Sequence, residues 1–66
     1  MTHAMDTWLA EHPARGVVLR AYRAAGAVWY TATLTRWMEE ELAQGDGPTM
    51  GEACDSALRA LKRGLV

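Results

Sequence analysis

The longest run of apolar and small residues lies in the middle of the chain. Residues 24–35 read AAGAVWYTATLT and carry no charge. The segments on either side are rich in Arg, Ala, Leu, Met and Glu, which favour helices. Pro13 suits a first helical turn, and Gly45 suits a position just past a helix end. The pattern predicts one long helix over about 13–43, about 45 Å long at 1.5 Å per residue.

The apolar positions of this predicted helix fall into more than one stripe. A helix that is apolar on all sides is either buried on all sides or spans a membrane. A membrane span needs about twenty apolar residues, and the uncharged run is shorter, so we expect burial by protein and no membrane association. One stripe advances by alternating steps of four and three, as in a heptad seam. We assign this stripe to a dimer seam: Val17, Ala21, Ala24, Val28, Thr31, Thr35, Met38 and Leu42.

Both ends of the chain also show helical patterns. Met5, Trp8 and Leu9 share one helical face, which predicts a short helix over about 3–11 with Thr2 or Asp6 as its cap. The alternative is a frayed terminus in which only Trp8 is held in place. Residues 44–48 read QGDGP and predict a loop.

The C-terminal segment begins with a capping box. Thr49 and Glu52 have the S/T-x-x-E spacing of this motif, which predicts a helix over about 49–63 with one apolar stripe. A short loop would pack this helix against the long one as an αα-hairpin. The predicted fold class is therefore all-α. It consists of a short N-terminal helix, a long central helix and a C-terminal helix whose hairpin dimerises into a four-helix-type bundle.

Length and composition support self-association. The chain has 66 residues, half of them hydrophobic, and a single cysteine, so it forms one domain without an internal disulfide. Domains of this size usually need a disulfide, a metal or oligomerisation for stability. We therefore expect a homodimer, and the sequence leaves its parallel or antiparallel arrangement open.

Signs of catalysis or metal binding are missing from the sequence. The only histidines are His3 and His12, and no HExxH or CxxC spacing occurs, so we expect no metal, no cofactor and no enzyme activity. Cys54 lies on an apolar stripe and is interpreted as a small buried hydrophobe. The alternative, a catalytic thiolate, would require a lowered pKa.

The aromatic residues suggest an interface. The chain has three Trp and two Tyr but no Phe, and Trp, Tyr and Arg dominate binding hot spots. The alternative is that these aromatics fill a homodimer core. The candidate residues for contact with a protein partner are Arg23, Trp29, Tyr30, Arg36 and Trp37.

These features predict a small dimeric helical protein that binds and modulates, by inhibition, an unidentified cytoplasmic protein. Its size and helical plan resemble those of small phage- or plasmid-encoded inhibitors of host factors, a likeness of size and shape alone. The N-terminus lacks a signal-peptide pattern, so we expect a cytoplasmic location. The alternative is a small dimeric helical DNA-binding repressor of the helix-turn-helix kind, with the last helix as its recognition helix. Glu52 and Asp55 early in the last helix and a net charge of −1 disfavour nucleic acid as a partner.

Overall fold

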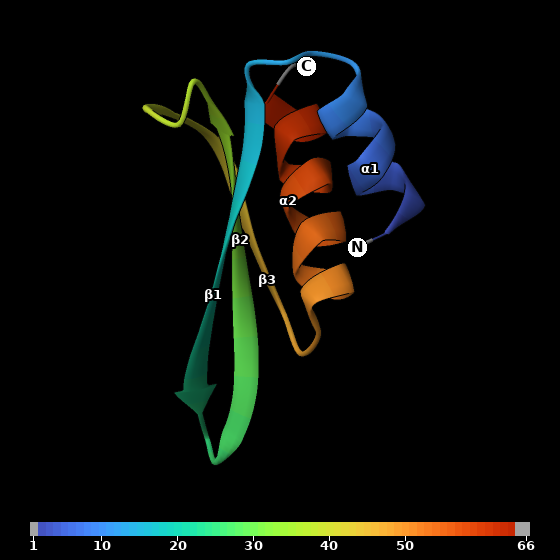
Figure 1. Cartoon of the computed structure of the whole chain (residues 1–66). Helices are drawn as coiled ribbons and strands as arrows, with labels where there is room; N and C mark the ends of the chain where they lie inside the picture. Colours follow the sequence, from blue (N-terminus) through green and yellow to red (C-terminus); the bar gives the residue numbers. More distant parts are fainter. Residues whose placement is uncertain (1, 65–66) are drawn as a thin grey trace.

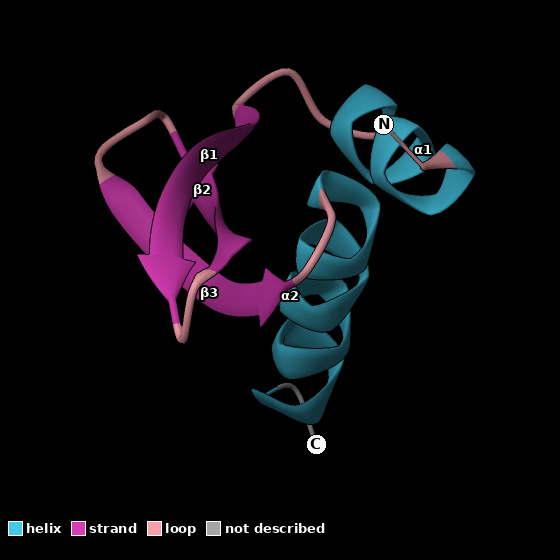
Figure 2. Cartoon of the chain, turned by 90° about the horizontal axis from the view of Figure 1, so that it is seen from below, coloured by secondary structure: helices cyan, strands magenta, loops and turns pink. Residues whose placement is uncertain are grey.

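A computed structural model describes residues 2–64 and shows a three-stranded sheet with two helices on one side of it (Figure 1). In chain order the elements are α1 (His3–Ala10), β1 (Arg15–Ala24), β2 (Ala27–Arg36), β3 (Glu40–Gly47) and α2 (Met50–Gly64). The sheet is antiparallel with strand order β1-β2-β3. Both helices lie on one side of the sheet, and within residues 2–64 no helix covers its other face (Figure 2).

The prediction of an all-α fold is wrong. The segment 13–43, expected to be one long helix, instead forms β1, β2 and the start of β3, so neither an αα-hairpin nor a four-helix bundle can form from it. The physical reason lies at its centre. Ala25 and Gly26 have φ angles of 50° and 78°, and two consecutive left-handed residues form the tight turn that suits a two-residue β-hairpin. β2 that follows is rich in β-branched and aromatic residues, which favour strands.

Strand register places alternate side chains of the hairpin toward the helices. Leu34 of β2 lies between Val17 of β1 and Ala43 of β3, and Ala32 lies between Leu19 and Gly45 in the same way. Since side chains alternate along a strand, the threonines of β2 point to the open face. A β-bulge interrupts the pairing of β2 with β3 between Leu34 and Thr35.

The hairpin extends beyond the rest of the sheet. β3 ends at Gly47, which pairs with Tyr30, so the part of the β1–β2 hairpin beyond Tyr30 is only two strands wide. Figure 1 shows this part projecting past the start of α2. Its residues from Arg20 to Val28 are all exposed.

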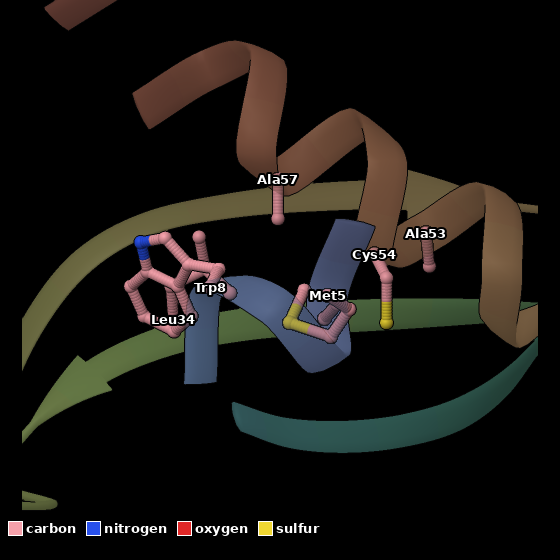
Figure 3. Packing of buried hydrophobic residues seen from close by; sticks show 7 residues of the cluster. Met5, Trp8, Leu34, Ala53, Cys54 and Ala57 are labelled. Carbon is pink, nitrogen blue, oxygen red and sulfur yellow. The ribbon is translucent and has the colours of Figure 1, made fainter. Parts of the chain in front are cut away.

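The core lies between β2, α1 and α2 and contains many small side chains (Figure 3). Its buried members are Met5, Trp8, Ala32, Leu34, Ala53, Cys54 and Ala57. Two glycines of β3 bring α2 close. A β-carbon added to Gly45 would lie 2.2 Å from the backbone nitrogen of Ala57, and one on Gly47 would lie 2.7 Å from that of Ala53. The helix backbone therefore rests directly on the backbone of β3.

Threonines cap both helices. The Thr2 hydroxyl accepts a hydrogen bond from the Met5 N–H at 3.2 Å. The Thr49 hydroxyl accepts from the Glu52 N–H at 3.2 Å and donates to the Glu52 carboxylate at 3.3 Å, so Thr49 caps α2 as the capping box predicts. The expected loop over 44–48 is wrong in most of its length, because β3 continues to Gly47. Within residues 2–64, neither helix is long and apolar enough to cross a bilayer.

Candidate protein-interaction surface

The turn between β2 and β3 exposes two large apolar side chains on an unfavourable backbone. Trp37 and Met38 have φ angles of 57° and 58°, and the two residues are 69% and 66% exposed. The left-handed region costs a non-glycine residue roughly 1–2 kcal/mol. Bulky residues in this region are uncommon and often mark functional positions. Trp37 and Met38 together form the exposed turn.

Contacts on both sides hold the exposed turn in place. The Trp37 N–H donates a hydrogen bond to the Ala14 carbonyl at 2.7 Å. The Met38 sulfur accepts a hydrogen bond from the Thr35 hydroxyl at 3.5 Å, and a β-carbon on Gly16 would lie only 2.8 Å from this sulfur. An ion pair between Arg36 and Glu40 spans the turn. Trp37 is thus presented to solvent from a fixed backbone.

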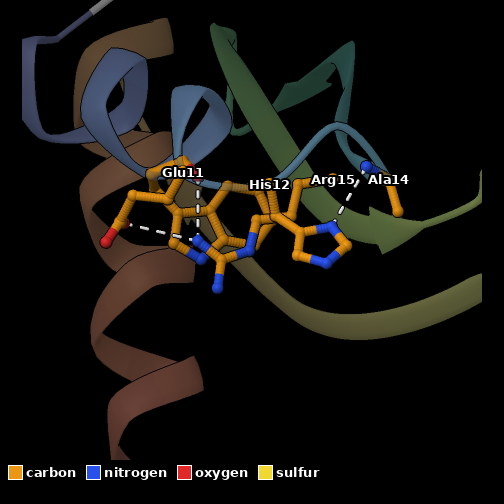
Figure 4. A network of polar contacts seen from close by, with 5 residues as sticks. Glu11, His12, Ala14 and Arg15 are labelled. Atoms are coloured by element: carbon orange, nitrogen blue, oxygen red, sulfur yellow. Dashed lines mark hydrogen bonds and ion pairs between the residues drawn. The ribbon is translucent and has the colours of Figure 1, made fainter.

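The segment that receives the Trp37 N–H is itself braced against α1 (Figure 4). Arg15 donates to the Trp8 carbonyl at 2.9 Å and to the Glu11 carboxylate at 3.3 Å, and its guanidinium lies 4.9 Å from the centroid of the Trp8 ring. The Ala14 N–H donates to His12 Nδ1 at 3.3 Å. These contacts connect α1 to the start of β1 and give the exposed turn a rigid support.

A second group of aromatic side chains lies on the open face of the projecting hairpin. Tyr22 and Trp29 are directly opposite each other in the ladder. The Tyr22 hydroxyl donates to the Asp46 carboxylate at 3.3 Å. Partial desolvation of its hydroxyl raises the pKa of Tyr22, and the negative charge of Asp46 raises it further. Tyr22 therefore stays protonated and reaches from β1 to β3 across the open face.

The structure does not bring the five predicted contact residues into one patch. Arg23 and Trp29 lie toward the hairpin tip, whereas Arg36 and Trp37 lie at the opposite end of β2. Trp29 and Trp37 are eight positions apart, or about 26 Å at 3.3 Å per residue of extended chain. Tyr30 is half-buried and packs against the core. The best-presented aromatic of the set is Trp37.

The predicted dimer seam has no helix on which to lie. Its eight residues are distributed over β1, β2, the β2–β3 turn and β3, and they occupy both faces of the sheet. Steps of four and three join odd and even positions, and strand side chains alternate with a period of two. The seam therefore does not form a continuous surface. One of its members, Met38, belongs to the exposed turn instead.

Neither chemistry nor a known relative assigns a reaction to these surfaces. Cys54 is fully buried, and burial together with the charge of Asp55 raises the pKa of its thiol, the opposite of what a catalytic thiolate requires. Among residues 2–64, no three His, Cys, Asp or Glu side chains gather as metal ligands would. No protein-family model, curated protein or solved structure matches the chain.

Proposed function

We propose that this protein binds and inhibits another cytoplasmic protein, and that the exposed turn is the centre of the contact. The observation that carries the proposal is the combination of exposure and strain at Trp37 and Met38. A hairpin turn with two left-handed residues is most stable with Asn and Gly. A tryptophan and a methionine there lower stability and leave apolar surface in water. Burial against a partner would offset both costs.

The surroundings of the exposed turn fit a hot spot. Trp and Arg are enriched among residues that dominate binding, and Arg36 lies next to Trp37. The turn's bracing by Ala14, Thr35 and the Arg36–Glu40 pair means that little side-chain and backbone freedom remains to be lost on binding.

The test is a double replacement, Trp37→Asn with Met38→Gly, which suits the backbone and removes both apolar side chains. Because Asn and Gly tolerate the left-handed region, the variant should be at least as stable as the parent in urea unfolding. Loss of a hot spot that contributes about 2 kcal/mol or more should lower the affinity for the partner about thirtyfold. The partner is first captured from the native host with tagged protein and identified by mass spectrometry, and its affinity is then measured by calorimetry.

Val28→Ala is the matched control, because Val28 is an exposed apolar residue at the far end of the hairpin. It should leave the affinity for the captured protein within about threefold of the parent value, as expected for an interface-remote surface change. If the turn replacement folds and retains full affinity, the exposed turn is not the contact and the proposal fails.

The structure changes the grounds for two predictions, the homodimer and the DNA-binding alternative. A homodimer remains a prediction from the small size of the chain, but a helical seam cannot form it; light scattering at micromolar concentration tests it. The DNA-binding alternative loses its helix-turn-helix basis, because three strands separate α1 from α2. The first turn of α2 also carries an exposed carboxylate, Glu52, where a recognition helix would meet bases.

A further inference from the structure

The strand β1 is a long outer edge of the sheet. Its ten residues pair only with β2, so its other side carries backbone N–H and C=O groups that no strand among residues 2–64 satisfies. Natural edge strands are commonly protected by shortness, proline, a bulge, charged side chains or a covering element. Of these devices β1 has the charged side chains of its arginines. β1 contains no proline, its ladder with β2 runs without a register shift, and α2 packs on β3 and β2 instead.

The edge is also apolar in part and basic in charge. Val17 and Leu19 face the helices but remain half-exposed, and Val18 lies half-exposed on the open face. β1 carries Arg15, Arg20 and Arg23 and no acidic residue. Arg15 is engaged with Glu11, whereas Arg20 and Arg23 are exposed and make no ion pair within the described chain.

These observations indicate the chemistry of a segment that could occupy the free edge of β1. We infer that β1 accepts an extended acidic segment of the partner protein as a fourth, antiparallel strand. Main-chain hydrogen bonds to a sheet edge supply affinity in this mode of recognition, and alternate side chains supply specificity. Carboxylates opposite Arg20 and Arg23 would complete the charge pairing, and apolar side chains opposite Val17 and Leu19 would cover the half-exposed inner face.

A second copy of this chain fits the edge less well. Two β1 strands side by side would bring the three arginines of each into one ladder with no carboxylate on either strand. Like charges placed opposite each other in a ladder are destabilising. The inference rests on the proposed function and deepens it, because the exposed turn adjoins this edge: Trp37 donates its N–H to Ala14, immediately before β1.

The probe is a nine-residue peptide, acetyl-Thr-Glu-Thr-Val-Glu-Val-Thr-Val-Thr-amide. Laid antiparallel along residues 24 to 16, it places its two glutamates opposite Arg23 and Arg20 and its three valines opposite Ala21, Leu19 and Val17. Titration into labelled protein should shift the backbone amide resonances of residues 16–24. A peptide with lysine in place of both glutamates should bind about tenfold more weakly, since two charge pairs change sign.

The double variant Arg20→Glu with Arg23→Glu is the reciprocal test. Both side chains are exposed, so the fold should persist by circular dichroism, and the variant should prefer the lysine peptide over the glutamate peptide. Equal binding of the two peptides by the parent, or shifts confined to α2, would overturn the inference. So would a dimer in which the β1 amides that point away from β2 are already protected from hydrogen exchange, because the occupant would then be a second copy.

Capture of the partner separates this inference from the proposed function. If the double replacement of Trp37 and Met38 loses the partner while the arginine double variant keeps it at full affinity, the exposed turn is the contact and β1 is not. If the arginine variant alone loses the partner, β1 is the contact and the proposal for the exposed turn fails.

Discussion

Replacement of Gly45 by alanine tests the way in which α2 rests on the sheet. The added β-carbon would lie 2.2 Å from the backbone nitrogen of Ala57 and 2.5 Å from the carbonyl carbon of Ser56. Both are helix backbone atoms, which cannot rotate away as a side chain can. Ordinary contact begins near 3.4 Å, so α2 must move from β3 by more than 1 Å.

Such a movement separates the buried residues of α2, Ala53, Cys54 and Ala57, from Leu34 on β2. Overpacking of a core costs typically 1–3 kcal/mol, and a clash with backbone belongs at the upper end, about 3 kcal/mol. A chain of this size has a free energy of unfolding of roughly 3–10 kcal/mol, so the variant should lose a large part of its stability.

Urea unfolding followed by circular dichroism measures the effect. With a slope near 1 kcal/mol per molar urea for so small a protein, the midpoint should fall by about 3 M. Gly64→Ala is the matched control, because the same methyl group there meets nothing within 4 Å, and its effect should stay within about 0.5 kcal/mol. A stability of Gly45→Ala within 0.5 kcal/mol of the parent, on the scale expected for a harmless surface change, would refute the close seating of α2 on β3.

Three further outcomes are expected. Thr49→Ala removes the cap of α2 and should lower the free energy of unfolding by about 1 kcal/mol in urea; an unchanged value would contradict the capping role. The thiol of Cys54 should react with a disulfide reagent at pH 8 only as fast as the protein unfolds, because it is buried and its pKa is raised; rapid reaction of the folded protein would contradict this. Ultraviolet titration should show that Tyr22 ionises above its ordinary pKa of 10.0 and that Asp46→Asn lowers this pKa; an unchanged pKa in the variant would exclude the Asp46 contact. Because the pKa of Tyr22 is raised in the folded state, its stabilising contribution is present below about pH 10 and is lost as the pH rises above that value.

Features that depend on neighbours along the chain are predictable from the sequence. The cap of α2 and its apolar stripe can be read from residues 49–63, because a capping box joins Thr49 to a residue three positions on and a helical stripe repeats every three to four residues. The buried state of Cys54 also followed from its position on that stripe. Each of these features depends on residues of one helix and on the surface against which that helix packs.

The central segment was mispredicted because its strands are stabilised by partners distant in the sequence. Arg, Ala and Leu in the flanks favour a helix locally, and the pairing of Val17 with Leu34 or of Leu34 with Ala43 outweighs that preference. Two local signals of the true structure were present. Threonines alternate with Tyr30, Ala32 and Leu34, and Ala25–Gly26 stands between two segments that contain β-branched and aromatic residues.

The surfaces proposed for function were decided by tertiary structure alone. Trp37 and Met38 carry no turn signal, because side chains of their size disfavour the left-handed backbone that they adopt, and only the pairing of β2 with β3 and the hydrogen bond to Ala14 impose it. Gly45 suggested a loop, yet it lies within β3 because α2 needs a position without a β-carbon there. The free edge of β1 likewise depends on the strand order β1-β2-β3 and on the packing of α2 against β3 and β2, which no local pattern of the sequence specifies.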